Sequence, residues 1–335
     1  MRREEPRGYL CVLAGTTLWG VSTVVAKSLF ALGIPPAQLV LIRLALSVLV
    51  LFFVFLCFNR SRLVISTSEI PYFVILGWVG VAANQFTYYF TISKIHIALG
   101  LLIQYFGAIW VTLYAFRFQK EPISKWKILA LFMALLGCYL AVGGYRIDLL
   151  RLNGVGILSG LACSLFGAFY VLYGEKGLKR HAPWTLIFYG FGFGAIGVGF
   201  FVSPVQIVTG GYSLKMWMAF FYIAIFQTLI PFGLYFSGID RIRATRASIT
   251  SAWEIIAGAL SAYVVLGEML NPLQIMGGVA VIAAIIFLQI EKERTAPSSS
   301  FSIRQKDNPP PLSSSRVPSY HSSPIRNTEE KGSAP

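Results

Sequence analysis

Stretches of about twenty residues with few or no charges, the length a helix needs to cross a hydrocarbon core about 30 Å thick, recur from residue 8 to residue 290. Charged residues make up only 13% of the chain and apolar residues 56%, whereas roughly 25% and 45 to 50% are usual in soluble domains. Backbone groups in lipid must be satisfied within the spanning segment, and helices do this. The chain is therefore predicted to be an all-α integral membrane protein.

Ten transmembrane helices are predicted, joined by short linkers that contain Pro, Gly or charged residues. A cytoplasmic N-terminus at 1–7 precedes a first five-helix repeat at 8–144 and a second at 154–290. The composition then changes to Ser, Pro and charge, which predicts a disordered, basic cytoplasmic tail at 291–335. The predicted spans are 8–31, 37–58, 70–92, 97–117, 125–144, 154–174, 183–202, 215–237, 244–266 and 272–290.

The two halves of the chain resemble each other. A shift of 147 residues (268 − 121) pairs Glu121 with Glu268 and Pro36 with Pro183, and a one-residue slip improves other pairs. Because each half holds an odd number of spans, the second half enters the membrane from the opposite side. The prediction is therefore an inverted repeat, as found in many secondary transporters. Glu121 and Glu268, shared by both halves, are interpreted as structural residues that complement the dipole of the next helix.

Positive charge is distributed as this topology requires. The predicted inner linkers and the tail hold most of the Lys and Arg residues, which explains the net charge of +14 without a nucleic-acid partner. Both termini are predicted to be cytoplasmic. The predicted outer linkers keep only these basic residues: Lys27, Lys94, Arg146, Arg151 and Lys215.

Short motifs occur in a characteristic order along the chain. They are Leu18-Trp19-Gly20, Gly33-Ile34-Pro35-Pro36 leading to Arg43, Tyr89, and the runs that end in Glu121-Pro122 and Gly267-Glu268. From Gly8 to Ile290 the chain thus resembles the ten-helix, EamA-type branch of the drug/metabolite transporter superfamily. The resemblance implies two inverted five-helix repeats, a central substrate cavity, and movement of amino acids or similar small metabolites by alternating access.

The chain departs from the family at two positions. The family often has proline where this chain has Ala108 and Ile255, so the sequence leaves open whether the fourth and ninth spans are broken there.

A multi-pass protein of a bacterial-type plasma (inner) membrane is expected.

Polar residues deep within the spans are the candidates for function, because an ionised group mid-membrane costs about 2.5 to 3.5 kcal/mol on insertion scales. Glu254 is predicted to line the cavity and either bind a cationic group, such as an α-amine, or take up a proton that couples transport. The alternative is a structural acid bonded to Trp19, Gln104 or a backbone group. Arg43 either binds substrate, or extends its charged end to the interface, or pairs with a loop acid.

The other candidates are aromatic and amide side chains. Aromatic rings can form a cavity wall that stacks on a substrate, or they can be packing residues. Asn84, Gln85 and Gln227 either bond a substrate or join helices. The predicted substrate-binding set is Glu254, Trp253, Trp19, Gln104, Tyr105, Asn84, Arg43 and Gln227.

Enzyme chemistry has no sequence support. The chain has no HExxH, GxSxG or P-loop motif, and its four cysteines, which have no CxxC or Cys/His spacing, are interpreted as packing residues. No cofactor, metal or nucleic-acid partner is expected; the expected partners are a small-molecule substrate and the lipid bilayer, and a homodimer is one option for assembly. The alternatives to a secondary transporter are a channel-like facilitator and a membrane receptor or scaffold.

Overall fold

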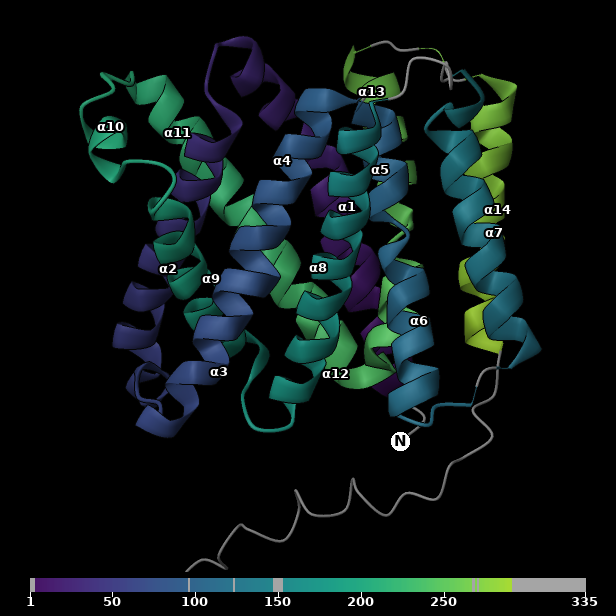
Figure 1. The fold of residues 1–335 in the computed structure, drawn as a ribbon, viewed down its shortest axis with the longest axis horizontal. Coiled ribbons are helices and arrows are strands. Elements are labelled where there is room, and N and C mark those ends of the chain that lie inside the picture. The colour runs from purple at the N-terminus through teal and green to yellow at the C-terminus, as the bar shows by residue number, and fades with distance from the viewer. Residues whose placement is uncertain are drawn as a thin grey trace, which may run out of the picture. The chain divides into compact units, whose positions relative to one another are not determined.

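The computed structural model describes residues 4–95, 97–122, 124–146, 153–266, 269 and 271–290, and every regular element in these ranges is helical (Figure 1). This confirms the all-α prediction for the described part of the chain. Glu268 and the tail predicted at 291–335 lie outside the described residues.

The helices follow the apolar windows of the sequence. Several begin with proline in the first turn, where its missing N–H breaks no intrahelical bond. The α-helices are α1 (Glu4–Ala31), α2 (Pro36–Phe58), α3 (Ile70–Ile75), α4 (Asn84–Lys94), α5 (Ile97–Gln104), α6 (Gly107–Phe118), α7 (Lys125–Ala141), α8 (Gly154–Leu178), α9 (Pro183–Gly199), α10 (Pro204–Val208), α11 (Leu214–Tyr222), α12 (Ile230–Thr250), α13 (Trp253–Leu266) and α14 (Pro272–Ile290). The 3₁₀ turns are η1 (Arg60–Leu63), η2 (Thr67–Glu69) and η4 (Gly144–Arg146).

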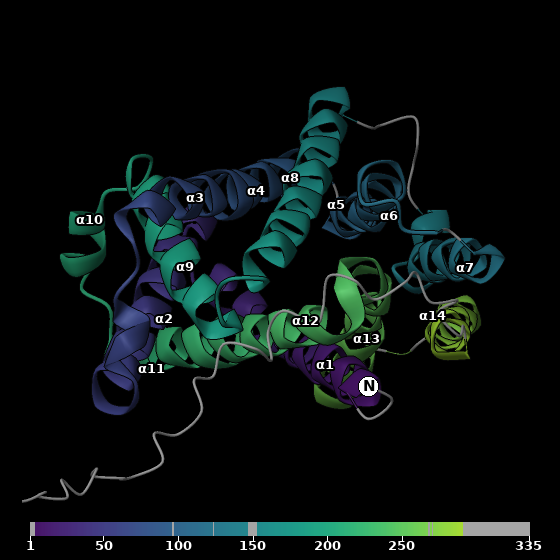
Figure 2. The ribbon, with the colours of Figure 1, turned by 90° about the horizontal axis from the view of Figure 1, so that it is seen from below.

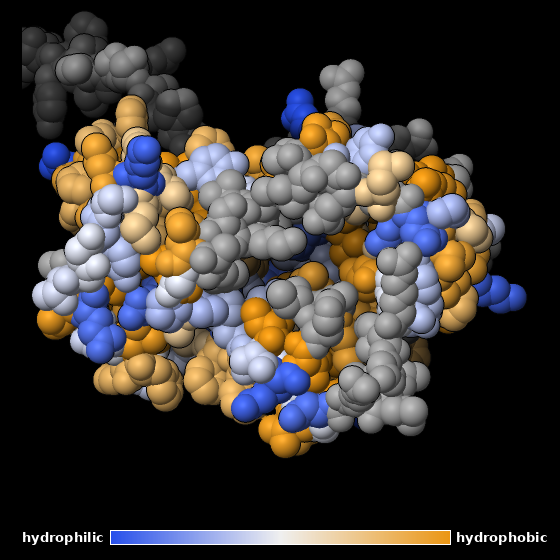
Figure 3. Space-filling view, turned by 90° about the horizontal axis from the view of Figure 1, so that it is seen from above, coloured by the Kyte–Doolittle hydropathy of each residue, from blue (hydrophilic) through white to orange (hydrophobic). Residues whose placement is uncertain are grey.

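Five helical segments among the described residues are long and apolar enough to cross a membrane. Large apolar side chains are exposed along the helices, for example Phe53, Phe116 and Phe132, and apolar residues make up much of the surface in Figure 3. Such faces suit a lipid environment. The five segments are Pro36–Phe58, Thr67–Lys94, Leu99–Phe118, Gly154–Leu178 and Leu214–Thr250, and shorter apolar helices cover Pro183–Gly199 and Pro272–Leu288.

Two of the predicted spans are interrupted. The span predicted at 97–117 is divided between α5 and α6, and the span predicted at 244–266 is divided immediately before α13. At each interruption, backbone N–H groups bond to the carbonyl three residues earlier in the chain, which is a tighter turn than in an α-helix. The bonds at the second interruption lie 146 residues after those at the first (252 − 106). The bonds are Phe106 N to Ile103 O, Ala108 N to Tyr105 O and Ile109 N to Phe106 O, then Ala252 N to Ile249 O, Glu254 N to Ser251 O and Ile255 N to Ala252 O. The helices therefore break without the prolines that the family often has.

A second pair of irregular segments lies at nearly the same offset, 147 residues at the start (223 − 76) and 146 at the end (229 − 83). The π-helical segment η3 (Leu76–Ala83) joins α3 to α4, and the π-helical segment η6 (Ile223–Leu229) joins α11 to α12. Insertions of this kind widen a helix locally and occur frequently at functional sites. Asn84 follows η3 directly, and Gln227 lies within η6.

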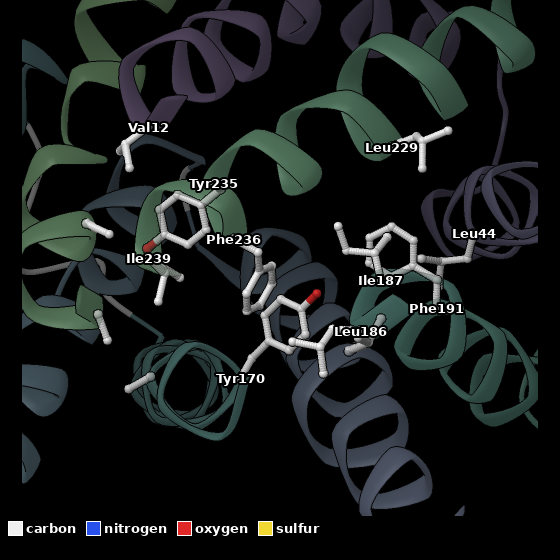
Figure 4. Packing of buried hydrophobic residues seen from close by; sticks show 14 of the residues in the cluster. Val12, Leu44, Tyr170, Leu186, Ile187, Phe191, Leu229, Tyr235, Phe236 and Ile239 are labelled. Carbon is white, nitrogen blue, oxygen red and sulfur yellow. The ribbon is translucent and has the colours of Figure 1, made fainter. Parts of the chain in front are cut away.

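Helices from the first half of the chain pack against helices from the second half. The helix α1 packs on α12 and α13, while α8 packs on η3, α4 and α6. The pairs α2 with α9 and α7 with α14 are seen end-on in Figure 2. Around α8, α9 and α12 the core is aromatic: Tyr170 meets Phe236 edge-on at a centroid distance of 5.2 Å (Figure 4). The functional candidates therefore lie where the two halves meet.

Candidate functional site

The Glu254 carboxylate lies in the first turn of α13, just after the second helix break. Its Oε2 accepts a hydrogen bond from the Tyr105 hydroxyl at 2.9 Å, and Tyr105 lies in the first helix break. The two breaks therefore meet through their side chains. Neither Trp19 nor Gln104, the partners considered from the sequence, makes this bond; the partner is Tyr105.

Close packing of α1 fixes the position of Glu254. A Cβ atom added to Gly20 would lie 2.6 Å from both the Glu254 backbone oxygen and the Gly258 nitrogen. The Trp253 indole Nε1 also donates to Thr17 Oγ1 at 2.8 Å. The glycine of the Leu18-Trp19-Gly20 motif thus allows the backbone of α1 to touch α13, and Trp253 anchors that contact.

Trp19 belongs to an aromatic cluster on the other side of α1. Its ring centroid lies 4.8 Å from Phe232 and 5.4 Å from Tyr235. Aromatic pairs in this distance range contribute packing energy beyond their buried area. Trp19 and Trp253 are therefore both held in contacts between helices.

A small pocket lies beside Arg43 on α2. Arg43 Nε is buried without a hydrogen-bond partner, and no ion pair joins Arg43 to a described acid, Glu254 included. Thr228 is fully buried, and its Oγ1 also lacks a partner. The pocket is lined by Arg43, Leu44, Gly80, Val81, Asn84, Gln85, Tyr170, Phe191, Thr228 and Phe232.

Asn84 connects this pocket to α8. Its Nδ2 donates to the Cys163 carbonyl at 2.9 Å, so the amide joins two helices while lining the pocket. By contrast, the half-buried Gln104 and Gln227 line neither this pocket nor the smaller one beside Tyr105. The structure therefore brings only some of the predicted polar residues together.

Tyr88 connects the Glu254 site and the Arg43 pocket electrostatically. It interacts electrostatically with both Glu254 and Arg43. Sequence reasoning did not select Tyr88 or Thr228, because a single Tyr or Thr in an apolar helix is common and carries no pattern. The only available signal for Thr228 was its position next to Gln227.

A buried ion pair lies at the linker between α6 and α7. Lys127 Nζ lies 2.9 Å from Glu121 Oε1, and both side chains are about 5% exposed or less. Glu121 Oε2 accepts from Thr245 Oγ1 at 3.3 Å and lies 3.5 Å from Arg243 Nη1. The N-cap of α7 is Ser124, and the observed partners of Glu121 are Lys127, Thr245 and Arg243.

Arg243 extends this network to α8. Its Nη2 donates to Gln119 Oε1 at 2.8 Å, and its Nε lies 3.7 Å from Glu175 Oε1. Glu175 in turn accepts from Gln119 Nε2 and from the Ala244 backbone N–H. Arg243 has φ 71°, in the left-handed region, and divides α12 into two helical parts. We call Glu121, Lys127, Arg243, Glu175, Gln119 and Thr245 the linker network.

The comparisons with known proteins identify the family. The model of the EamA-like transporter family matches residues 6–143 and again residues 154–290. The chain belongs to the EamA-like transporter family. The resemblance seen in the sequence is thereby confirmed, and the family and its relatives are transporters rather than enzymes.

Curated relatives of this EamA-family chain match most of its length at low identity. An uncharacterized inner membrane transporter, YicL of Salmonella typhimurium, is 25% identical over 87% of this chain and 97% of its own length. The threonine/homoserine exporter RhtA of Escherichia coli is 25% identical over 77% of this chain and 83% of its own. A solved crystal structure superposes with a TM-score of 0.72 at 16% identity, over 87% of this chain and 100% of the other, and so shares the fold.

Among the described residues, no group of three or more His, Cys, Asp or Glu side chains is placed to hold a metal ion. What the site offers is one carboxylate, one guanidinium, amides and phenols in an apolar bundle. Such groups can bind and release a polar solute or a proton.

Proposed function

We propose that this EamA-family chain is a secondary transporter that moves a small amino-acid-like metabolite by alternating access, with Glu254 and Tyr105 at its substrate or proton site. The proposed architecture is ten transmembrane helices in two inverted five-helix repeats, at 8–144 and 154–290. The matching breaks and π segments at offsets of 146 to 147 residues support this duplication.

The observation that carries the proposal is the carboxylate between two broken helices. Discontinuous helices near the middle of the bilayer form substrate and ion sites in many transporters. Irregular backbone at membrane depth is tolerated where it is buried in protein or lines a cavity. Glu254 accordingly binds a cationic group or a proton, and Tyr105 orients it.

The relatives favour a small polar solute. RhtA is named for the export of threonine and homoserine, and an α-amino group is a suitable cation for Glu254. The predicted residues Trp19 and Trp253 are assigned to the surroundings of this site, and Asn84 and Arg43 to the pocket on α2. Gln104 and Gln227 line neither pocket in this conformation.

The linker network serves as a closure at one end of the molecule. It joins the linker after α6, in the first half, to Glu175 and Arg243 in the second half. Charge pairs that bridge two moving parts must separate when that end opens. The basic linkers support a cytoplasmic location for this end and for both termini, in an inner membrane.

The proposal is tested in proteoliposomes that contain the purified protein. Labelled L-threonine is measured in uptake and counterflow, with and without a proton gradient. We expect saturable counterflow in the wild type and its loss in Glu254→Gln. The matched control is Glu69→Gln, which changes an acid that pairs with His181 outside the site. Wild-type counterflow and gradient dependence in Glu254→Gln contradict the role of Glu254, while flux without counterflow indicates a channel-like facilitator.

A further inference from the structure

The pocket at Arg43 is separate from the Glu254 site. Glu254 does not line it, and Arg43 makes no ion pair with Glu254. Among the described residues that line it, Arg43 is the only charged one. In this conformation the Arg43 guanidinium therefore forms no ion pair with a described acid.

Two donors in the pocket have no acceptor. Arg43 Nε and Thr228 Oγ1 are both buried without a hydrogen-bond partner among the residues that the structure describes. Buried polar groups are nearly always satisfied, and an exception of this kind needs an explanation, such as a missing ligand. Both atoms belong to residues that line the same pocket, so one ligand can satisfy them together.

The chemistry of the lining indicates the kind of ligand. A guanidinium binds carboxylates with two parallel hydrogen bonds, and Thr, Asn and Gln side chains can donate further ones. A phosphate monoester carries a charge of about −1.5 to −2 at neutral pH, which one guanidinium does not balance, whereas a carboxylate carries a single charge. The remaining lining combines glycine and aliphatic residues with the aromatic residues Tyr170, Phe191 and Phe232, and suits a compact apolar body.

We propose that the Arg43 pocket is an anion subsite that binds the carboxylate of a small organic acid, with Arg43 and Thr228 as its donors. The proposal rests on the proposed function, because it gives the transported solute a carboxylate. It assigns Thr228 a role in recognition that follows from its unsatisfied hydroxyl alone. Asn84 and Gln85 complete the polar wall.

The test uses purified full-length protein in detergent and pairs of probes that differ only in the carboxylate. The pairs are L-threonine with L-threoninamide, L-lactate with lactamide, and benzoate with benzamide. Thermal stabilisation is measured against probe concentration. In the wild type, at least one acid is expected to bind about tenfold or more tightly than its amide, because hydrogen bonds to charged groups contribute roughly ten- to hundredfold in affinity.

Variants identify the donors. Arg43→Gln is expected to abolish the preference for the acid, and Arg43→Lys, which keeps the charge without the planar fork, to retain part of it. Thr228→Val keeps the shape and is expected to weaken acid binding by roughly three- to tenfold. The matched control is Thr250→Val, because Thr250 is also buried with an unpartnered hydroxyl but lies outside the pocket lining.

The outcomes separate this proposal from the proposed function. It is overturned if no acid stabilises the wild type, if amides bind as well as acids, if the acid preference survives in Arg43→Gln, or if Thr250→Val weakens binding as much as Thr228→Val. Acid-selective binding without counterflow upholds the subsite and contradicts the transporter. Counterflow without any acid preference upholds the transporter and contradicts the subsite.

Discussion

Tyr105 and Glu254 are 149 positions apart in the sequence, and the hydroxyl of the first donates to the carboxylate of the second at 2.9 Å. Each residue lies at a break in its helix, and the two breaks have the same backbone hydrogen bonds. A single side-chain contact thus links the irregular segments of both halves. Any movement of one half against the other must change this contact.

Tyr105→Phe removes the donor and leaves the ring. We expect transport to fall by about ten- to a hundredfold, because a hydrogen bond to a charged group contributes about 1.5 to 3 kcal/mol, while the protein still folds. Initial rates in proteoliposomes and size-exclusion profiles measure this. Tyr114→Phe, which changes an exposed ring on α6, is the control and is expected to be neutral. Equal rates in the two variants contradict the role of Tyr105.

Gly20→Ala places a methyl group against the backbone of α13. The added Cβ would lie 2.6 Å from Glu254 O, so the helices must separate, which costs about 1 to 3 kcal/mol in overpacked sites. We expect a lower melting temperature in detergent and loss of transport. Gly192→Ala is the control, since nothing lies within 4 Å of its added Cβ. A Gly20→Ala protein with normal stability and transport rules out the close approach.

Glu121→Gln removes the negative charge that pairs with the buried Lys127 ammonium, which keeps only uncharged acceptors, among them the Pro122 carbonyl at 3.4 Å. Breaking a buried pair from one side destabilises by about 3 to 5 kcal/mol, so we expect a marked loss in resistance to unfolding. Lys127→Met is expected to cost less, because Glu121 keeps Arg243 and Thr245. Unfolding curves of both single variants and of the double variant measure the coupling. Additive effects indicate that the pair does not interact.

Arg243→Gln removes the cation that joins Glu121 to Glu175. If the linker network closes one end, this change opens it and exposes Thr245, which is 2% exposed. We expect several-fold faster labelling of Thr245→Cys by an impermeant maleimide in a background without the four native cysteines. Arg241→Gln, a change at a nearby arginine outside the linker network, is the control. Unchanged labelling in Arg243→Gln contradicts the closure.

The sequence predicted the all-helical class correctly because its causes are local. A segment that crosses lipid must satisfy its own backbone, so apolar length alone indicates where helices run. The same argument marked Arg43 and Glu254, since a charge within an apolar span stands out. The family motifs added the glycine at position 20, whose reason appeared only when α1 was seen against α13.

The two helix breaks could not be predicted from the sequence of either span alone. Without proline at Ala108 or Ile255, nothing in the residues required a break, yet both spans tighten at the same relative position. Tertiary contacts, such as that between Tyr105 and Glu254, accompany both interruptions. A backbone irregularity that depends on neighbouring helices cannot be read from one span.

By itself, the sequence determined that this chain is an all-helical membrane protein with charges at a few deep positions, because hydrophobic length and charge cost act residue by residue. Only the tertiary structure decided that Glu254 meets Tyr105, that Glu121 meets Arg243, and that Thr228 shares a pocket with Arg43. These relationships depend on the distances between helices. Such distances follow from the packing of surfaces that are remote in the sequence.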